Sequence, residues 1–268
     1  MRRLAAALIA VVCLAIGSSI ALGSEPENGR EPSANASAKV LRARIVTGTG
    51  NLRKAVKRFR HLLGPDNGGG PGGKSNGRRE LNWDGVPDEF ASPNALPSDF
   101  FNAKVAPRAR GAVLETPGDH VAVSARPGNP AGAAVRFGDV NPTYANRFKT
   151  FSAPRLFSPI GSNVVNLTFR VPGTDTRATV RGFGAVYTDI DRRETAFQYF
   201  DKRGRLLGKF AAPISKGGRS FLGVVYNKRR VARVRIRYGS GKLGPNESKH
   251  YDVAVMDDFF YAEPRPAG

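Results

Sequence analysis

Apolar and polar residues alternate along much of the second half of the chain. Short runs rich in β-branched and aromatic residues recur between residues 178 and 261, and Gly, Pro, Asn, Asp and Lys separate them. In the segment 233–238, R-V-R-I-R-Y, every second residue is apolar, which is the period of a strand with one buried face. The turn sequence D-K-R-G between residues 197–200 and 206–210 predicts a hairpin. The pattern predicts an all-β domain over residues 78–263, an antiparallel β-sandwich of jelly-roll type.

One amphipathic helix is predicted ahead of the sandwich, over residues 51–63. Its apolar residues follow the i, i+3, i+4, i+7 spacing of one helix face, and arginines and lysines cover the remainder. Thr49 or Asn51 would cap its start, and Gly64-Pro65 would end it. The apolar stripe predicts docking on the sandwich. The alternative is that this basic helix lies on an anionic membrane or cell-wall polymer.

A glycine-dominated loop, D-N-G-G-G-P-G-G-K-S-N-G, follows the helix over residues 66–77. Helix and loop together occupy residues 49–77, and we expect the loop to act as a hinge in front of the sandwich. Residues 68–75 also satisfy the G-x-x-x-x-G-K-S spacing of a phosphate-binding loop. A working loop of that kind follows a buried strand and opens a helix, whereas this one follows a helix. We therefore expect no nucleotide ligand.

The first 23 residues have the pattern of a secretory signal peptide. Two arginines follow Met1, residues 4–22 are mostly apolar, and small residues precede a cleavage position at Ser24. The alternative is an uncleaved membrane anchor. The only cysteine, Cys13, lies in this segment, so the mature chain would have neither a disulfide nor a Cys-type zinc site. We expect a secreted or extracytoplasmic protein associated with the cell envelope.

Polar, proline-containing sequence predicts a flexible leader over residues 24–48. Within it, the segment 39–46, K-V-L-R-A-R-I-V, also suits a strand or a helical turn. At the other end, residues 264–268 form a short tail after the sandwich. The folded part of the chain is therefore expected to be one domain.

The chain is strongly basic, with 42 Lys and Arg against 22 Asp and Glu and a formal net charge of +20. Excess positive charge attracts anionic polymers or surfaces. The alternative explanation is a compositional bias in codon usage without any ligand. No RNA-binding aromatic motif accompanies the basic residues, and an exported protein meets little nucleic acid, so we do not expect nucleic acid as the partner.

Two features are candidates for ligand binding. Arg233, Arg235 and Arg237 lie two residues apart, which puts them on one face of a strand about 7 Å apart. They could follow an acidic glycan or an anionic wall polymer, or they could form a solvated face paired with acids on a neighbouring strand. Trp83, the sole tryptophan, could stack under a sugar ring or fill the core.

Adjacent acids in the last predicted strand indicate a possible cation site. Asp257 and Asp258 project to opposite faces of V-A-V-M-D-D-F-F-Y, so one of them should point inward. An inward carboxylate needs a cation or several donors. Calcium suits oxygen ligands, and Asp84 and Asp88 could join Asp258 if the first sandwich strand runs beside the last. The alternative is that Asp258 accepts backbone N–H groups or pairs with an arginine.

Little in the sequence indicates catalysis. The three histidines are far apart, with no His-x-x-x-His pair of the kind that binds a metal ion. A hydrolase would have to use carboxylates such as Asp189, Asp191 or Glu194, and glycoside hydrolysis needs two of them across a cleft.

Several separated motifs carry a resemblance to a known group of proteins. The sequence G-R-R-E-L-N-W-D-G at residues 77–85, F-R-H-L-L-G at 59–64 and M-D-D-F at 256–259 resemble exported bacterial proteins of uncharacterised function over residues 50–263. Some members carry sorting tails, whereas this chain ends E-P-R-P-A-G. More distantly, the D-D-F segment is similar to jelly-roll carbohydrate-binding modules of the galactose-binding type. That resemblance implies a sugar ligand and a structural calcium ion held near the last strand.

The sequence therefore predicts a secreted, non-catalytic binding or surface-associated β-sandwich, with a glycan or anionic wall polymer as ligand and calcium as a structural ion. Two alternatives remain open at this stage. One is a secreted glycosidase or esterase that uses carboxylates, and the other is a structural envelope protein with no small ligand.

Overall fold

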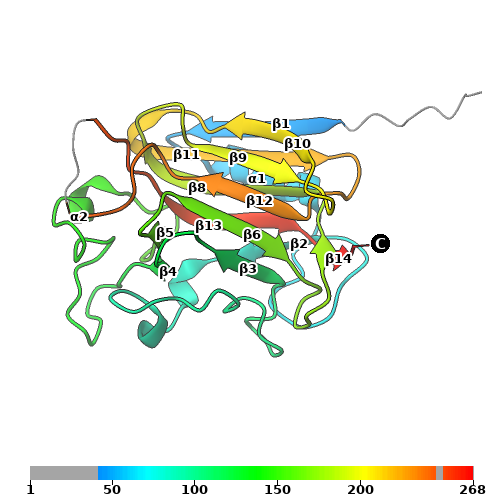
Figure 1. Ribbon diagram of the computed structural model, residues 1–268, viewed down its shortest axis with the longest axis horizontal. Helices are drawn as coiled ribbons and strands as arrows, with labels where there is room; N and C mark the ends of the chain where they lie inside the picture. The colour runs from blue at the N-terminus through cyan, green and yellow to red at the C-terminus, as the bar shows by residue number, and fades with distance from the viewer. Residues whose placement is uncertain (1–41, 246–249, 268) are drawn as a thin grey trace, which may run out of the picture. The chain divides into compact units, whose positions relative to one another are not determined.

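A computed structural model describes residues 42–245 and 250–267 of the chain (Figure 1). The signal segment with Cys13, and the leader up to residue 41, lie outside the described residues. The described chain folds into two large antiparallel sheets with few helices. Among these residues, no helix is both long and apolar enough to cross a membrane.

The larger sheet has seven strands in the order β1-β11-β8-β13-β5-β4, with β2 also paired to β13. Neighbouring strands run antiparallel throughout. The strands are β1 (Ala43–Thr49), β2 (Arg78–Leu81), β4 (His120–Val123), β5 (Phe157–Ile160), β8 (Gly182–Ile190), β11 (Ser215–Tyr226) and β13 (Val255–Ala262).

The second sheet has five antiparallel strands in the order β10-β9-β12-β6-β3, and a two-stranded sheet joins β14 to β7. These strands are β3 (Ala112–Glu115), β6 (Val164–Phe169), β7 (Ala178–Thr179), β9 (Ala196–Phe200), β10 (Leu206–Ala211), β12 (Arg233–Arg237) and β14 (Arg265–Pro266). The helical elements are α1 (Arg53–Leu63), α2 (Tyr144–Arg147) and two 3₁₀ turns, Trp83–Gly85 and Asp88–Phe90. The predicted antiparallel all-β sandwich is confirmed, whereas its jelly-roll type stays a prediction.

The predicted helix docks on the outer face of the seven-stranded sheet. Val56, Phe59 and Leu63 on α1 are buried. The ring of Phe59 rests over the paired glycines Gly184 and Gly223, where an added Cβ would lie 2.8 Å and 2.5 Å from ring atoms. These two glycines leave the space that the ring fills. Docking covers the outer side of β8 at Gly184, so this part of the strand is buried both by the core and by α1.

A second apolar cluster covers the β4–β5 end of the same outer face. Phe137, Tyr144 and Phe148, from the long connection between β4 and β5, pack with Val255 of β13. Tyr144 and Phe148 stack with ring centroids 4.7 Å apart. The seven-stranded sheet therefore sits in the middle of the domain, with side chains packed on both of its faces.

Two predicted boundaries are corrected by the strands. The leader predicted over 24–48 overlaps β1, which pairs with β11 along seven residues, so the open choice for segment 39–46 resolves to a strand from Ala43. Asn51, rather than Thr49, accepts a backbone N–H at the helix start, that of Arg53 at 3.2 Å. The predicted tail is partly a strand, because β14 pairs with β7. Both segments add to sheets through backbone bonds, which a local pattern of side chains does not reveal.

Candidate functional site

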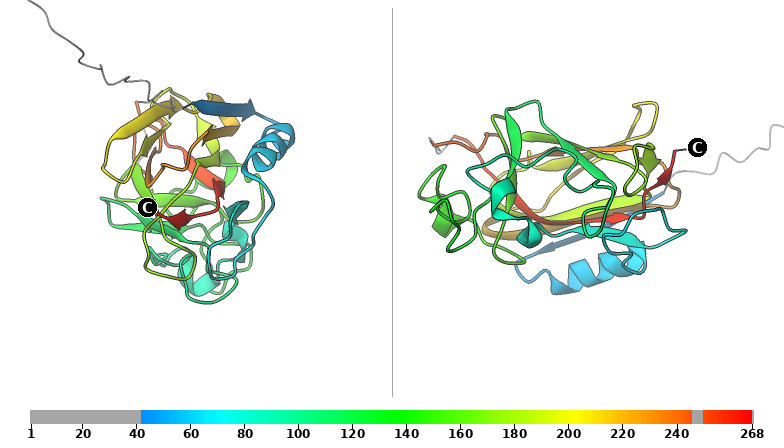
Figure 2. Two further views of the ribbon diagram at one scale, coloured as in Figure 1. Left: turned by 90° about the vertical axis from the view of Figure 1, so that its right-hand side faces the viewer. Right: turned by 90° about the horizontal axis from the view of Figure 1, so that it is seen from below.

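The outer face of the five-stranded sheet carries the three arginines of β12. Val234 and Ile236 point into the core, Arg235 and Arg237 are exposed, and Arg233 is half-buried. In the right-hand view of Figure 2, β12 and α1 lie on opposite sides of the domain. The helix therefore covers the other sheet and leaves this face open.

A row of polar side chains crosses this face through the middle of β12. Arg235 lies opposite Gln198 on β9 and Asn166 on β6. The row continues to Lys209 on β10 at one end and to Glu115 on β3 at the other. Among the residues that the structure describes, Arg235 has no ion-pair partner, and the row has more basic than acidic groups. The sequence left open that acids on a neighbouring strand pair with these arginines. In the register of β12 with β6 and β9, no acid lies directly opposite Arg233, Arg235 or Arg237.

Arg233 is held more firmly than the other two arginines. Its guanidinium lies 4.0 Å from the centre of the Phe200 ring and donates to Oδ1 of Asn166 at 3.0 Å. Partial burial, together with the nearby charge of Arg235, lowers the pKa of its guanidinium. Arg233 is thus a preorganised cation, whereas Arg235 and Arg237 extend into solvent.

Trp83 is a core residue and offers no ring face to a sugar. Its exposed fraction is 0%, and its ring stacks on Phe157 with centroids 4.3 Å apart. Its indole Nε1–H donates to the backbone carbonyl of Asp257 at 2.9 Å. Of the two roles that the sequence left open for Trp83, packing in the core is the one found, because the 3₁₀ turn that begins at this residue points the indole inward, and the candidate ligand role is not supported.

Asp257 and Asp258 form a buried carboxyl pair around the hydroxyl of Ser152. Oδ1 of Asp257 and Oδ1 of Asp258 lie 3.0 Å and 2.9 Å from Ser152 Oγ. The hydroxyl carries a single proton, so it can donate to one carboxylate only, and the second contact requires a proton on the carboxyl group. Burial raises the pKa of Asp257 well above its ordinary value and raises that of Asp258 to about 6. The pair therefore keeps a proton to a higher pH than an exposed carboxyl group would.

The predicted calcium ligands Asp84, Asp88 and Asp258 are not all suited to a cation. Arg155 and Arg126 bind the carboxylate of Asp88 at 2.5 Å and 2.7 Å and lower its pKa, so two cations already engage its oxygens. Between residues 42–245 and 250–267, no three His, Cys, Asp or Glu side chains are grouped to hold a metal ion. Asp88 does not fit a calcium ligand set, and structural calcium stays a prediction that a calcium titration of the melting temperature would test.

The glycine-rich loop is ordered around the buried guanidinium of Arg79, which corrects its predicted role as a hinge. Arg79 and Glu263 are both 0% exposed and form a two-pronged ion pair at 2.7 Å and 2.9 Å. The same guanidinium donates to the carbonyl groups of Gly68, Gly70 and Gly72. A phosphate-binding loop directs N–H groups at an anion, whereas these carbonyl groups bind a cation.

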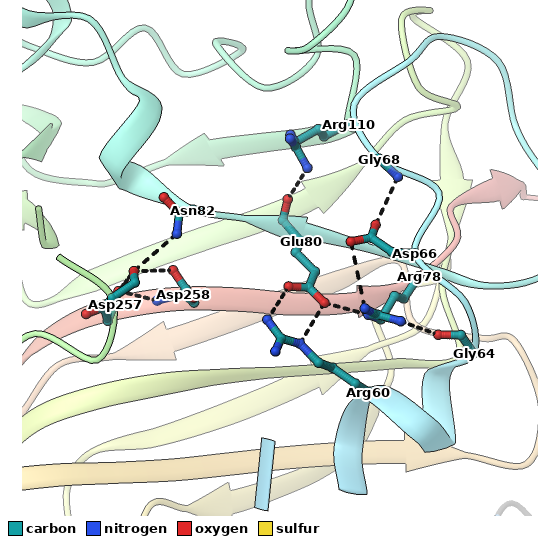
Figure 3. A network of polar contacts seen from close by, with 11 residues as sticks. Arg60, Gly64, Asp66, Gly68, Arg78, Glu80, Asn82, Arg110, Asp257 and Asp258 are labelled. Carbon is teal, nitrogen blue, oxygen red and sulfur yellow. Dashed lines mark hydrogen bonds and ion pairs between the residues drawn. The ribbon is translucent and has the colours of Figure 1, made fainter. Parts of the chain in front are cut away.

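A second ionic contact joins the helix to the first strand of the sandwich (Figure 3). Glu80 on β2 accepts two bonds from Arg60 of α1, at 2.9 Å and 2.6 Å, and one from Arg78 at 2.5 Å. Arg78 also donates to the carbonyl of Gly64 at the helix end. The R-R-E residues of the sequence motif therefore connect the helix and the loop to the sheet, and their charged groups form ion pairs and hydrogen bonds within the fold.

Two of the three carboxylates considered for a hydrolase pair with the same arginine. Asp189 and Asp191 both pair with Arg147. Asp189 also accepts the backbone N–H of Gly217 at 2.7 Å, and Asp252 accepts those of Asp191 and Arg192 at 3.1 Å each. Glu194 is exposed in the turn before β9. Asp189 and Asp252 therefore hold the ends of β8 and β11 in place.

The sequence interpretation missed the basic residues that other strands and turns add to the β12 arginines. Lys209 joins the row on β10, and Lys202 and Arg203 lie in the β9–β10 turn beside Arg230. The turn sequence D-K-R-G-R of the predicted hairpin contains some of these basic residues. Their position next to β12, however, depends on the order of the strands in the sheet.

Comparison of the chain with known protein families, with curated protein sequences and with solved structures finds no match.

Proposed function

We propose that this protein is an exported, non-catalytic β-sandwich module that binds an anionic polymer, such as an acidic glycan or an anionic wall polymer. The binding surface is the outer face of the five-stranded sheet. The observation that supports the proposal is the row of arginines on β12, which alternates with core residues and lies on an uncovered sheet face.

Electrostatics on this face favours a charged polymer over a small neutral ligand. Arg233, Arg235 and Arg237 repeat along the strand about every 7 Å, so a flexible chain of negative charges can contact them together. Each contact on an exposed surface is weak, but several in a row add to a useful affinity that falls as salt rises. An apolar pocket is not required for this kind of binding.

The buried acids support a non-catalytic role. Asp189 and Asp191 share one ion-pair partner, Arg147, and the buried Asp257 and Asp258 contact the hydroxyl of Ser152. Export rests on the signal pattern of residues 1–23, which lie outside the described residues. A polymer on the outside of the cell is the partner that a basic exported surface would meet.

Retention on an immobilised anionic polymer tests the proposal. The variant Arg235→Gln/Arg237→Gln removes two charges from the sheet face, and Lys57→Gln/Arg58→Gln removes two exposed charges from α1 on the opposite side. We expect wild-type protein to elute at a defined salt concentration, the sheet variant to elute at a clearly lower one, and the helix variant to elute close to wild type.

Equal losses in the two variants would mean that retention follows net charge and not this face. Absence of retention in the wild type at low salt would reject the proposal and favour a structural envelope role. Retention that salt leaves unchanged and a neutral sugar abolishes would also contradict it.

A further inference from the structure

β14 and the turn between β9 and β10 lie at the same end of the sandwich (Figure 1). Side chains from both line a basic hollow there. The connection from β11 to β12 forms its other wall. The volume is about 460 Å³, within the roughly 300–1,000 Å³ that ligand pockets occupy. Five basic side chains and one acid line it: Lys202, Arg203, Arg205, Arg229, Arg230 and Asp201. Chain segments far apart in the sequence thus gather positive charge at one place.

The single acid of the hollow does not neutralise this charge. Asp201 pairs with Arg205 at 2.8 Å, and its Oδ1 accepts the backbone N–H groups of Arg203 and Arg205 at 2.9 Å and 3.0 Å. Its carboxylate therefore holds the turn in shape and balances one arginine. The other four basic groups, Lys202, Arg203, Arg229 and Arg230, have no carboxylate partner among the described residues.

Arg229 is the most unusual of these groups. Its Nε is buried, and the described chain gives it no hydrogen-bond acceptor. Burial, followed by the charges of Arg265 and Arg181, lowers the pKa of its guanidinium. A partly desolvated guanidinium next to other cations is costly, and an anion in the hollow would supply the opposite charge.

An adjoining hollow of about 630 Å³ connects this end to the arginines of β12. The two hollows share Asp201, Lys202 and Ala267, and Arg233 of β12 lines the second one. Arg170 and Arg177 add two further cations there. Glu115 is the acid that this second hollow adds, so a polymer that runs along β12 meets a mainly basic path into the end of the sandwich.

We propose that the hollow formed by residues 202–205, 229–230 and 266–267 binds a phosphate or sulfate ester group of the anionic polymer. The inference rests on the proposed function and names the charged group that the polymer carries. Guanidinium groups bind tetrahedral oxyanions through paired N–H donors, and such an ester has more acceptor oxygens than a carboxylate. Several converging arginines match the phosphate or sulfate ester better than the carboxylate.

The test measures affinity by titration calorimetry at several salt concentrations for three polymers: polyphosphate, dextran sulfate and polygalacturonate. The hollow variant Arg203→Gln/Arg230→Gln is compared with the helix variant Lys57→Gln/Arg58→Gln, which removes the same charge from exposed positions on α1. We expect the hollow variant to lose about tenfold or more in affinity for phosphate or sulfate polymer, with a salt slope smaller by about two, one for each lost contact. Its affinity for polygalacturonate should stay within about threefold of the helix variant, because a general loss of charge affects both alike.

Each result has a distinct reading. Equal affinities of the hollow and helix variants for all polymers would overturn the inference, while binding by the sheet face would still stand. An equal loss for polygalacturonate would overturn the preference for tetrahedral oxyanions. If the wild type binds none of the polymers, the proposed function fails first and the inference falls with it. The polymer bound more tightly, polyphosphate or dextran sulfate, shows whether the hollow prefers phosphate or sulfate groups. The charge-conserving variant Arg203→Lys/Arg230→Lys separates paired donation from charge alone.

Discussion

The carboxyl pair of Asp257 and Asp258 predicts an unusual dependence of stability on pH. The pKa of Asp258 rises from 3.8 to about 6, with burial as the main cause. Because the native-state pKa lies above the unfolded-state value, the native state binds this proton more tightly. The stability that it contributes is present in acid and is lost as pH rises from about 4 to about 6. Two pKa units at 1.36 kcal/mol each correspond to about 3 kcal/mol.

The variant Asp258→Asn removes this titration and keeps the shape of the neutral acid. Its amide can donate to Ser152 Oγ, which leaves the hydroxyl proton for Asp257. The free energy of unfolding from urea titrations between pH 4 and pH 8 should therefore fall less steeply than in the wild type. Above pH 7 the variant should be more stable than the wild type, by up to about 3 kcal/mol. Asp252, whose pKa burial also raises to about 6, is unchanged in both proteins, so the difference between the curves isolates the pair.

A matched variant with the opposite sign provides the control. Hydrogen bonds from Arg205 and Arg203 lower the pKa of Asp201 even though burial alone would raise it. Its stabilisation is present above the unfolded-state pKa and is lost as pH falls, so Asp201→Asn should be less stable than the wild type at neutral pH. If Asp258→Asn follows the wild-type curve in parallel, or is less stable at pH 8, the assignment of a retained proton to this pair is wrong.

Three further predictions concern the contacts that hold the fold. Glu263→Gln leaves the buried guanidinium of Arg79 without its ionic partner and should cost about 3–5 kcal/mol of unfolding free energy. Trypsin should also cleave faster after Lys74, whose backbone N–H binds Glu263, and an unchanged cleavage rate would contradict the ordered loop. Phe59→Ala should cost about 3–5 kcal/mol, and Gly223→Ala should cost less in that background than in the wild type, because the ring that meets the new Cβ is gone; additive costs in the double-mutant cycle would refute this packing. Trp83→Phe should lower stability by about 1–3 kcal/mol through the lost bond to Asp257 while polymer retention stays unchanged; a loss of retention would restore Trp83 as a ligand contact.

The periodicity of the sequence predicted the helices and strands whose structure depends mainly on neighbouring residues. The alternation around Val234 and Ile236 gives β12 its buried face, and the spacing of Val56, Phe59 and Leu63 gives α1 its docking face. The β9–β10 hairpin follows from its turn sequence, and the strands pair as predicted. In each case neighbouring residues carry the information.

The errors concern contacts between distant parts of the chain. The glycine-rich loop is ordered because Arg79, which follows it, is buried against Glu263, near the C-terminal end of the sequence. Trp83 belongs to the core because Phe157 and the carbonyl of Asp257 meet it there. No local pattern distinguishes these roles from a hinge and a sugar platform.

The sequence predicted only part of the candidate binding surface, because the rest depends on contacts between distant segments of the chain. The period of β12 placed Arg233, Arg235 and Arg237 on one face. The hollow at the sandwich end needs the β9–β10 turn, the β11–β12 connection and the C-terminal β14, which lie far apart in the sequence and meet only in the folded sheets. The buried Nε of Arg229, which has no hydrogen-bond acceptor among the described residues, is likewise recognisable only in the folded chain.

Arginine footprinting tests the central claim most directly. The full chain is treated with an arginine-selective dicarbonyl reagent, with and without the anionic polymer, and the rate at each arginine is read by mass spectrometry. Polymer binding to the five-stranded sheet predicts slower modification of Arg235 and Arg237 and unchanged rates at Arg53 and Arg58, which are exposed on the opposite α1. Equal slowing at all four arginines, or slowing on α1 alone, would contradict binding by this face.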